Sequence, residues 1–146
     1  MDRHICVTRR FEFCAGHRLY RPDWSESQNR EVFGLCSNPE GHGHNYTLEV
    51  TVSGPLDPDT GMIMNLRQLK TLVNERVLLD VDHKNLNKDV SWMAGAIPTT
   101  EVFADRLWLR IAALLAKEAP KAALDSLVLH ETSNNKVSIR RSAGRA

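Results

Sequence analysis

Two stretches of the chain alternate between apolar and polar residues, which is the pattern of strands with one buried face. In residues 4–17 the odd positions are mostly apolar and end at His17, although Arg9 interrupts them. The second alternation begins at the pair His42 and His44 and continues to Ser53. We expect antiparallel pairing of these strands, which would bring the end of the first beside the start of the second.

Two helices are predicted by apolar stripes at helical spacing. Asn65 begins the first, and Gln68 three residues later resembles a capping box, with Asn replacing the usual Ser or Thr. This helix should end near residues 79–80. The second helix follows a Thr cap after Pro98, has an acidic first turn and closes before Pro120.

The remaining segments complete an α+β domain. Residues 18–35 lack a clear period and predict an active-site loop or a short helix. Residues 124–132 and 137–141 predict a hairpin whose turn uses the positive φ that asparagine tolerates. The order β-β-α-α-β-β indicates an antiparallel sheet with both helices on one face, in one domain over residues 1–146.

Bulk composition narrows the class of protein. Of 146 residues, 42% are hydrophobic and 25% are charged, and the net charge is +1. These values predict a globular domain without the basic field that nucleic acids or anionic membranes attract, so we expect neither as a partner. The N-terminal residues lack the apolar core of a signal peptide, which predicts a cytoplasmic protein whose three cysteines stay reduced.

Three histidines form the main chemical candidate. His42 and His44 share one face of a strand, and antiparallel pairing would add His17. Three imidazoles with an open fourth position are typical of catalytic zinc. A closed structural site with Cys14 or Cys36 as fourth ligand is the alternative, although strand parity turns Cys14 away.

Several other residues are weaker candidates. Cys36 lies in a loop six residues before His42, where its thiol is either inert or a thiolate that could act as nucleophile or base. Asp82 and His83 are adjacent, so helical spacing cannot join them as a hydrogen-bonded pair on one face, but both could face a third group. Glu131 is either a surface charge at a strand end or a buried acceptor for paired N–H groups.

The chain resembles the 6-pyruvoyltetrahydropterin synthase family over nearly its whole length. The matching blocks are FEFCAGHRL, VFGLCSNPEGHGHNY, DPDTGMIMNL, LLDVDHKNLNKDV, PTTE and LHETSNN. The resemblance implies the tunnelling fold, with edge-to-edge trimers stacked as homohexamers and active sites between subunits. It implies zinc on His17, His42 and His44. It further implies the following roles: Cys36 as catalytic thiolate with Asp82 and His83 in a relay, Glu131 as pterin anchor, and Thr99, Thr100 and Glu101 in the pterin pocket.

The implied reaction is a lyase step on 7,8-dihydroneopterin triphosphate, a small-molecule pterin. Zinc would acidify a C–H bond next to the substrate hydroxyls, and Cys36 would take the proton. An internal redox shift would then oxidise the side chain and reduce the pterin ring, and triphosphate would leave to give 6-pyruvoyltetrahydropterin. A second branch, 6-carboxytetrahydropterin synthase of queuosine precursor synthesis, usually has Cys-x3-HGH, whereas Cys36 and His42 here enclose five residues. A non-catalytic pterin-binding or structural zinc protein is a further alternative. Cys14 stands where Ser or Ala is commoner in the family.

Overall fold

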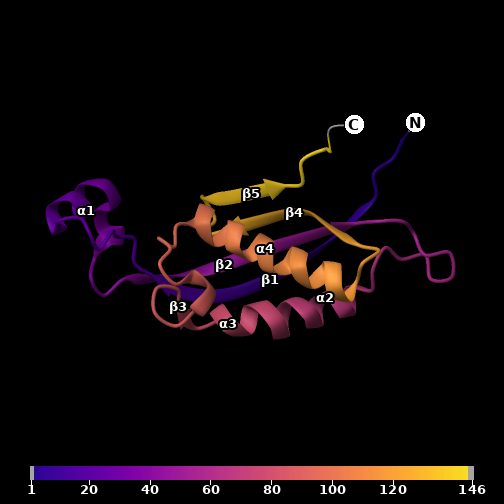
Figure 1. Ribbon diagram of the computed structural model, residues 1–146, viewed down its shortest axis with the longest axis horizontal. Coiled ribbons are helices and arrows are strands. Elements are labelled where there is room, and N and C mark those ends of the chain that lie inside the picture. Colours follow the sequence, from indigo (N-terminus) through magenta and orange to yellow (C-terminus); the bar gives the residue numbers. More distant parts are fainter. Residues whose placement is uncertain (1, 145–146) are drawn as a thin grey trace.

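The fold is one mixed β-sheet with its main helices packed on one face (Figure 1). The computed structural model describes residues 2–144. Within that range five strands lie in the order β3-β1-β2-β4-β5. Their bounds are β1 Cys6–His17, β2 His42–Ser53, β3 Lys84–Asn85, β4 Ala123–His130 and β5 Lys136–Arg140.

Strands β1 and β2 form the central antiparallel pair and confirm the predicted alternation. Their register runs without a break from Cys6 opposite Ser53 to His17 opposite His42. Strand β4 pairs with the other side of β2, with one register shift between Thr51 and Val52. The buried face of these three strands consists of large apolar side chains, namely Phe11, Phe13, Tyr46, Leu48, Val50, Val52, Leu124, Leu127 and Leu129.

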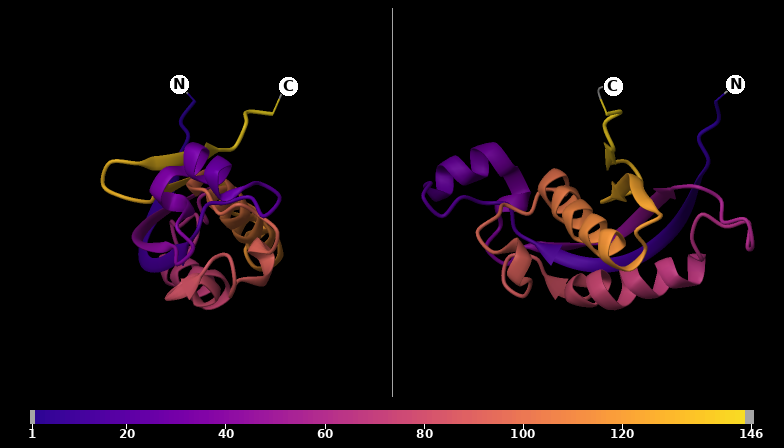
Figure 2. Two further views of the ribbon diagram at one scale, coloured as in Figure 1. Left: turned by 90° about the vertical axis from the view of Figure 1, so that its left-hand side faces the viewer. Right: turned by 45° about the vertical axis from the view of Figure 1, so that its right-hand side comes forward.

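The two long helical segments cover this apolar face, as predicted (Figures 1 and 2). Helix α2, Leu66–Val73, continues through a π-helical turn at Asn74–Leu78 into α3, Leu79–Val81. Helix α4 spans Thr100–Glu118. The helices bury Leu69, Leu72, Val73, Val77, Phe103, Leu107, Ile111 and Leu115 against the sheet. Each such side chain stabilises the fold by about 1.5–3 kcal/mol relative to exposure. No helix in residues 2–144 is both long and apolar enough to cross a bilayer.

Both predicted helix caps are present, but one differs in detail. The Thr99 hydroxyl accepts the Val102 N–H at 3.2 Å. Asn65 caps α2 by accepting the Arg67 N–H at 2.9 Å. The side-chain amide of Gln68 donates to the Glu118 carbonyl at 3.5 Å instead of closing a capping box. Gln68 therefore links the two helices rather than completing the cap.

Two predicted details of the sheet were wrong. The segment after Asp82 contains β3, which pairs parallel with β1 at Ala15 and Gly16, so the sheet is not purely antiparallel. The β4–β5 turn closes through the Glu131 N–H on the Asn135 carbonyl at 3.1 Å. This loop is long enough to close without positive φ, and within residues 2–144 His83 is the only non-glycine residue that has it.

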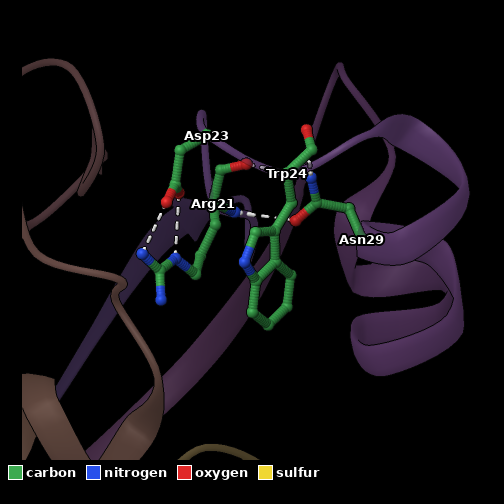
Figure 3. A network of polar contacts seen from close by, with 4 residues as sticks. All are labelled: Arg21, Asp23, Trp24 and Asn29. Carbon is green, nitrogen blue, oxygen red and sulfur yellow. Dashed lines mark hydrogen bonds and ion pairs between the residues drawn. The ribbon is translucent and has the colours of Figure 1, made fainter.

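The segment between β1 and β2 contains a short helix, α1 Glu26–Phe33, followed by a 3-10 turn at Gly34–Ser37. This unit stands beyond the ends of the two strands, away from α2 and α4 (Figure 1). The buried Asn29 holds it together: its side chain accepts the Arg21 N–H at 2.7 Å and donates to the Arg21 carbonyl (Figure 3). The same side-chain amide also donates to the Ser25 carbonyl. Arg21 also pairs with Asp23, and this hydrogen bonding lowers the pKa of the Asp23 carboxyl. Cys36 is thus carried by a locally fixed segment.

Candidate metal centre and pterin pocket

The three predicted histidines meet at the end of the central strand pair. His17 closes β1 opposite His42, and His44 follows on the same face. The Nε2 atom of His42 lies 3.1 Å from that of His17 and 3.0 Å from that of His44. The side chain of His17 is buried at 1% exposure, and burial lowers its pKa. At neutral pH this imidazole is therefore neutral, the form that binds metals.

The segment just before α4 fixes the tautomer of His17. Its Nδ1–H donates to the Pro98 carbonyl at 2.8 Å, because a carbonyl can only accept. The lone pair of His17 therefore sits on Nε2 and faces the two other Nε2 atoms. Zinc–nitrogen bonds of about 2.0–2.1 Å at tetrahedral angles separate ligand nitrogens by about 3.3 Å, close to the observed spacing. The three residues fit a zinc ion with one open position.

Glu131 lies beside these histidines, one residue past the end of β4. One carboxylate oxygen is 3.6 Å from His44 Nε2, and the other accepts the hydroxyl hydrogen of Thr100. Tyr46 follows His44 on the same face of β2, and the centroids of the two rings are 5.8 Å apart. Its hydroxyl is buried and has no hydrogen-bond partner in the described residues 2–144. Burial raises the pKa of Tyr46, and the charge of Glu131 raises it further. Glu131 is therefore a half-buried acceptor and not a surface charge.

The other predicted pocket residues, Thr99, Thr100 and Glu101, differ in burial and in hydrogen bonding. Thr100 is buried and binds Glu131. The Thr99 oxygen is engaged in capping α4, which leaves its hydroxyl hydrogen free to donate. Glu101 is exposed on the first turn of α4. The Thr99–Thr100 dipeptide thus connects the helix start to the carboxylate.

Asp82 and His83 form a hydrogen-bonded pair, contrary to the expectation from helical spacing. The backbone has left the helix at Asp82, and His83 adopts φ 61°, which turns its ring back. His83 Nδ1 then lies 2.9 Å from Asp82 Oδ1. The same oxygen accepts the Cys14 N–H at 3.1 Å. Adjacent residues can pair here because the backbone is not helical.

The two thiols considered as zinc ligands lie outside the three-histidine group. Cys14 has the parity that points away from it and groups instead with Asp82 and His83. Cys36 is half-buried in the 3-10 turn, where its carbonyl accepts the Leu19 N–H at 2.8 Å. Within residues 2–144 no hydrogen bond joins the side chain of Cys36 to Asp82 or His83. A single chain therefore does not assemble the implied relay.

Sequence reasoning missed two residues of the site. Pro98 orients His17 through its carbonyl, a backbone contact that no residue type signals. Tyr46 has the same parity as His44, so its position in the sequence could have predicted a hydroxyl group beside the histidines. Because its neighbours on the same face of β2 are apolar, it was interpreted as an ordinary core residue.

Comparison with known proteins agrees with this geometry. A sequence model of the family 6-pyruvoyl tetrahydropterin synthase matches residues 6–142. The 6-pyruvoyl tetrahydrobiopterin synthase of Pongo abelii is 46% identical over 129 residues, covering 88% of this protein and 86% of the relative. The 6-carboxy-5,6,7,8-tetrahydropterin synthase of Bacillus subtilis is 34% identical over 106 residues, covering 70% and 68%.

Solved structures confirm the predicted α+β tunnelling fold. The 6-pyruvoyl tetrahydropterin synthase of Caenorhabditis elegans superposes with a TM-score of 0.87 at 34% identity, covering 96% of this protein and 97% of that one. The shared fold, the matched length and the sequence identity point to one family. The chain belongs to the 6-pyruvoyl tetrahydropterin synthase family.

Proposed function

We propose that the protein is a zinc-dependent lyase that converts 7,8-dihydroneopterin triphosphate to 6-pyruvoyltetrahydropterin with elimination of triphosphate. The observation that carries this proposal is the position of Glu131, 3.6 Å from His44, beside three converging Nε2 atoms. A metal ligand set and an acceptor for a pterin edge are therefore adjacent. The 46% identity to a relative named for this activity supports the same assignment.

His17, His42 and His44 would hold the zinc ion. When bound, zinc supplies Lewis-acid chemistry toward the hydroxyl groups of the substrate. His17 is kept in the ligating tautomer by Pro98 and is shielded from water by the core. The fit of the nitrogen spacing to zinc supports this role.

Glu131 would anchor the pterin ring. Its carboxylate can accept two parallel hydrogen bonds from neighbouring ring N–H groups, the geometry of a guanidinium-like edge. Thr100 orients the carboxylate by donating to one of its oxygens. The Thr99 hydroxyl and exposed Glu101 lie at the same helix start, where they would border the ring.

Cys36 would act as the thiolate base that removes the substrate proton, with Asp82 and His83 completing the proton relay. Asp82 accepts from His83 Nδ1–H, which leaves His83 Nε2 as the proton acceptor. We propose that these groups meet across a subunit boundary in a homohexamer of stacked trimers. Two features support this: His83's side chain is 80% exposed, and β1 is paired by β3 at only two residues. The three free thiols, Cys6 among them, support a cytoplasmic location.

Product analysis tests the proposal directly. Purified protein is loaded with zinc, incubated with 7,8-dihydroneopterin triphosphate, and the products are identified by mass. We expect 6-pyruvoyltetrahydropterin and triphosphate. A carboxy product alone would assign the second branch of the family, and no product from a zinc-loaded protein that binds pterin would indicate a non-catalytic role.

Thiol variants separate catalysis from metal binding. Cys36→Ala should abolish turnover while one zinc per subunit stays bound to the three histidines. Cys6→Ala is the matched control, because Cys6 is exposed at the far end of β1. Mixing inactive Cys36→Ala subunits with inactive His83→Ala subunits should restore part of the activity if the relay crosses subunits. Mixtures that form but stay inactive would contradict that arrangement.

A further inference from the structure

A second group of metal-binding side chains lies on the opposite face of the sheet from the helices. It consists of Cys14, Asp82 and His83. One ligand atom from each, a thiol sulfur, a carboxylate oxygen and a ring nitrogen, all lie within 4.8 Å of one another. Cys14 points to this face because its neighbours Phe13 and Ala15 are buried on the other.

Backbone hydrogen bonds hold the three residues together. The His83 N–H donates to the Cys14 carbonyl at 2.7 Å, and the Cys14 N–H donates to Asp82 Oδ1 at 3.1 Å. Strand β3 then pairs with β1 immediately beyond. The cluster is therefore fixed by the junction of two strands and does not depend on chance contacts between mobile side chains.

His83 has an unusual backbone conformation that serves this arrangement. Its φ of 61° lies in the left-handed region, which costs a non-glycine residue about 1–2 kcal/mol. The turn places its ring beside Asp82, with 2.9 Å between Nδ1 and Oδ1. Strained residues of this kind persist where the surrounding structure over-determines them and cluster at functional sites.

The chemistry of the donors selects a class of ion. Thiolate and imidazole favour zinc and similar transition metals, whereas calcium and magnesium prefer sites made only of oxygen. Three protein ligands leave one position for water. A groove of about 540 Å³ opens over the cluster, lined also by Glu12, Asn45 and Thr47.

We propose that Cys14, Asp82 and His83 form a second transition-metal site, separate from the three histidines. Binding a zinc-class ion releases the thiol proton and ties up the carboxylate and the imidazole. Because the proposed function uses Asp82 and His83 in proton transfer, an ion held here inhibits turnover; this consequence rests on that function. The binding itself does not, since it depends only on the cluster.

Cobalt spectroscopy tests the site without an activity measurement. Metal-free protein is titrated with Co²⁺, and the sulfur-to-cobalt charge-transfer absorption in the near ultraviolet is followed. Because the three histidines provide no sulfur, this band reports a thiolate ligand. We expect two cobalt ions per subunit and the band in the wild type, in Cys6→Ser and in Cys36→Ser. Cys14→Ser should bind one ion and lose the band.

Two results would overturn the proposal. These are one ion without the band in the wild type, and a band that survives in Cys14→Ser. If the surviving band is lost in Cys36→Ser, Cys36 is a ligand of the three-histidine metal. Inhibition of turnover by excess Zn²⁺ is a second test. The Zn²⁺ concentration that gives half inhibition should be at least about tenfold higher for Cys14→Ser than for the wild type. Failure of the proposed lyase activity would leave the cobalt result intact.

Discussion

Gly41 lies against the metal centre, and its replacement by alanine tests how tightly the two strand ends must approach. Its φ is +69°, immediately before His42. A Cβ at this position would lie 2.7 Å from the carbonyl oxygen of His17 and 3.3 Å from its carbonyl carbon. The added methyl group therefore meets the backbone of a proposed zinc ligand, which cannot rotate away as a side chain could.

The cost has two parts. Positive φ costs an alanine about 1–2 kcal/mol. The contact with His17 must open by several tenths of an ångström, and overpacking of this kind costs about 1–3 kcal/mol more. Gly61→Ala is the matched control, because Gly61 has φ +72° and no atom within 4 Å of an added Cβ. We expect Gly61→Ala to lose about 1–2 kcal/mol of unfolding free energy and Gly41→Ala about 2–5 kcal/mol.

Two measurements report the effects on stability and on zinc binding. Urea denaturation of metal-free protein, at one fixed protein concentration, gives the unfolding free energies. Competition with a chromophoric chelator gives the zinc affinity, which should fall at least about tenfold in Gly41→Ala and stay unchanged in Gly61→Ala. Equal losses of stability together with equal zinc affinities would refute the argument that the His17 backbone limits this position.

Three further substitutions address single side chains. Tyr46→Phe should raise the unfolding free energy of metal-free protein by about 1 kcal/mol in urea, because it removes a buried hydroxyl without a partner in residues 2–144; a loss of stability would reveal a partner. Asn29→Ala should speed amide hydrogen exchange in residues 18–37 by a factor of about 30 or more, since it unpairs buried polar groups; unchanged protection would show that other contacts hold the segment. Thr99→Ala should lower thermal stability by about 1 kcal/mol through loss of the helix cap, and Thr99→Ser should not; equal stability in both would show that the cap contributes nothing.

The meeting of the three histidines could be predicted because strand pairing is a strong constraint. Alternation fixed the parity of His17, His42 and His44, and antiparallel pairing of the two strands brings the end of β1 beside the start of β2. The same parity correctly separated Cys14 from that group. Long periodic segments with one buried face carry this information in their sequence.

The Asp82–His83 pair could not be predicted because it depends on one unusual dihedral angle. Adjacent side chains on a helix do not face each other, and nothing in the sequence predicts a positive φ at His83. Strand β3 was missed for a related reason: two residues show no period. Both features arise from tertiary contacts with β1, which override local preference.

Because His17 pairs with His42, the geometry of the sheet does not depend on the conformation of the residues that connect the two strands. The ends of residues 18–41 are held at one strand spacing whatever lies in between, and α1 stands clear of the helical layer (Figure 2). Doubling the length of such a connection costs only about 0.6 kcal/mol in closure entropy. The helix α1 is therefore the part of this segment whose length and sequence can change most easily, provided that Cys36 and Gly41 keep their positions beside the strand ends. New specificity can be acquired there without rebuilding the scaffold.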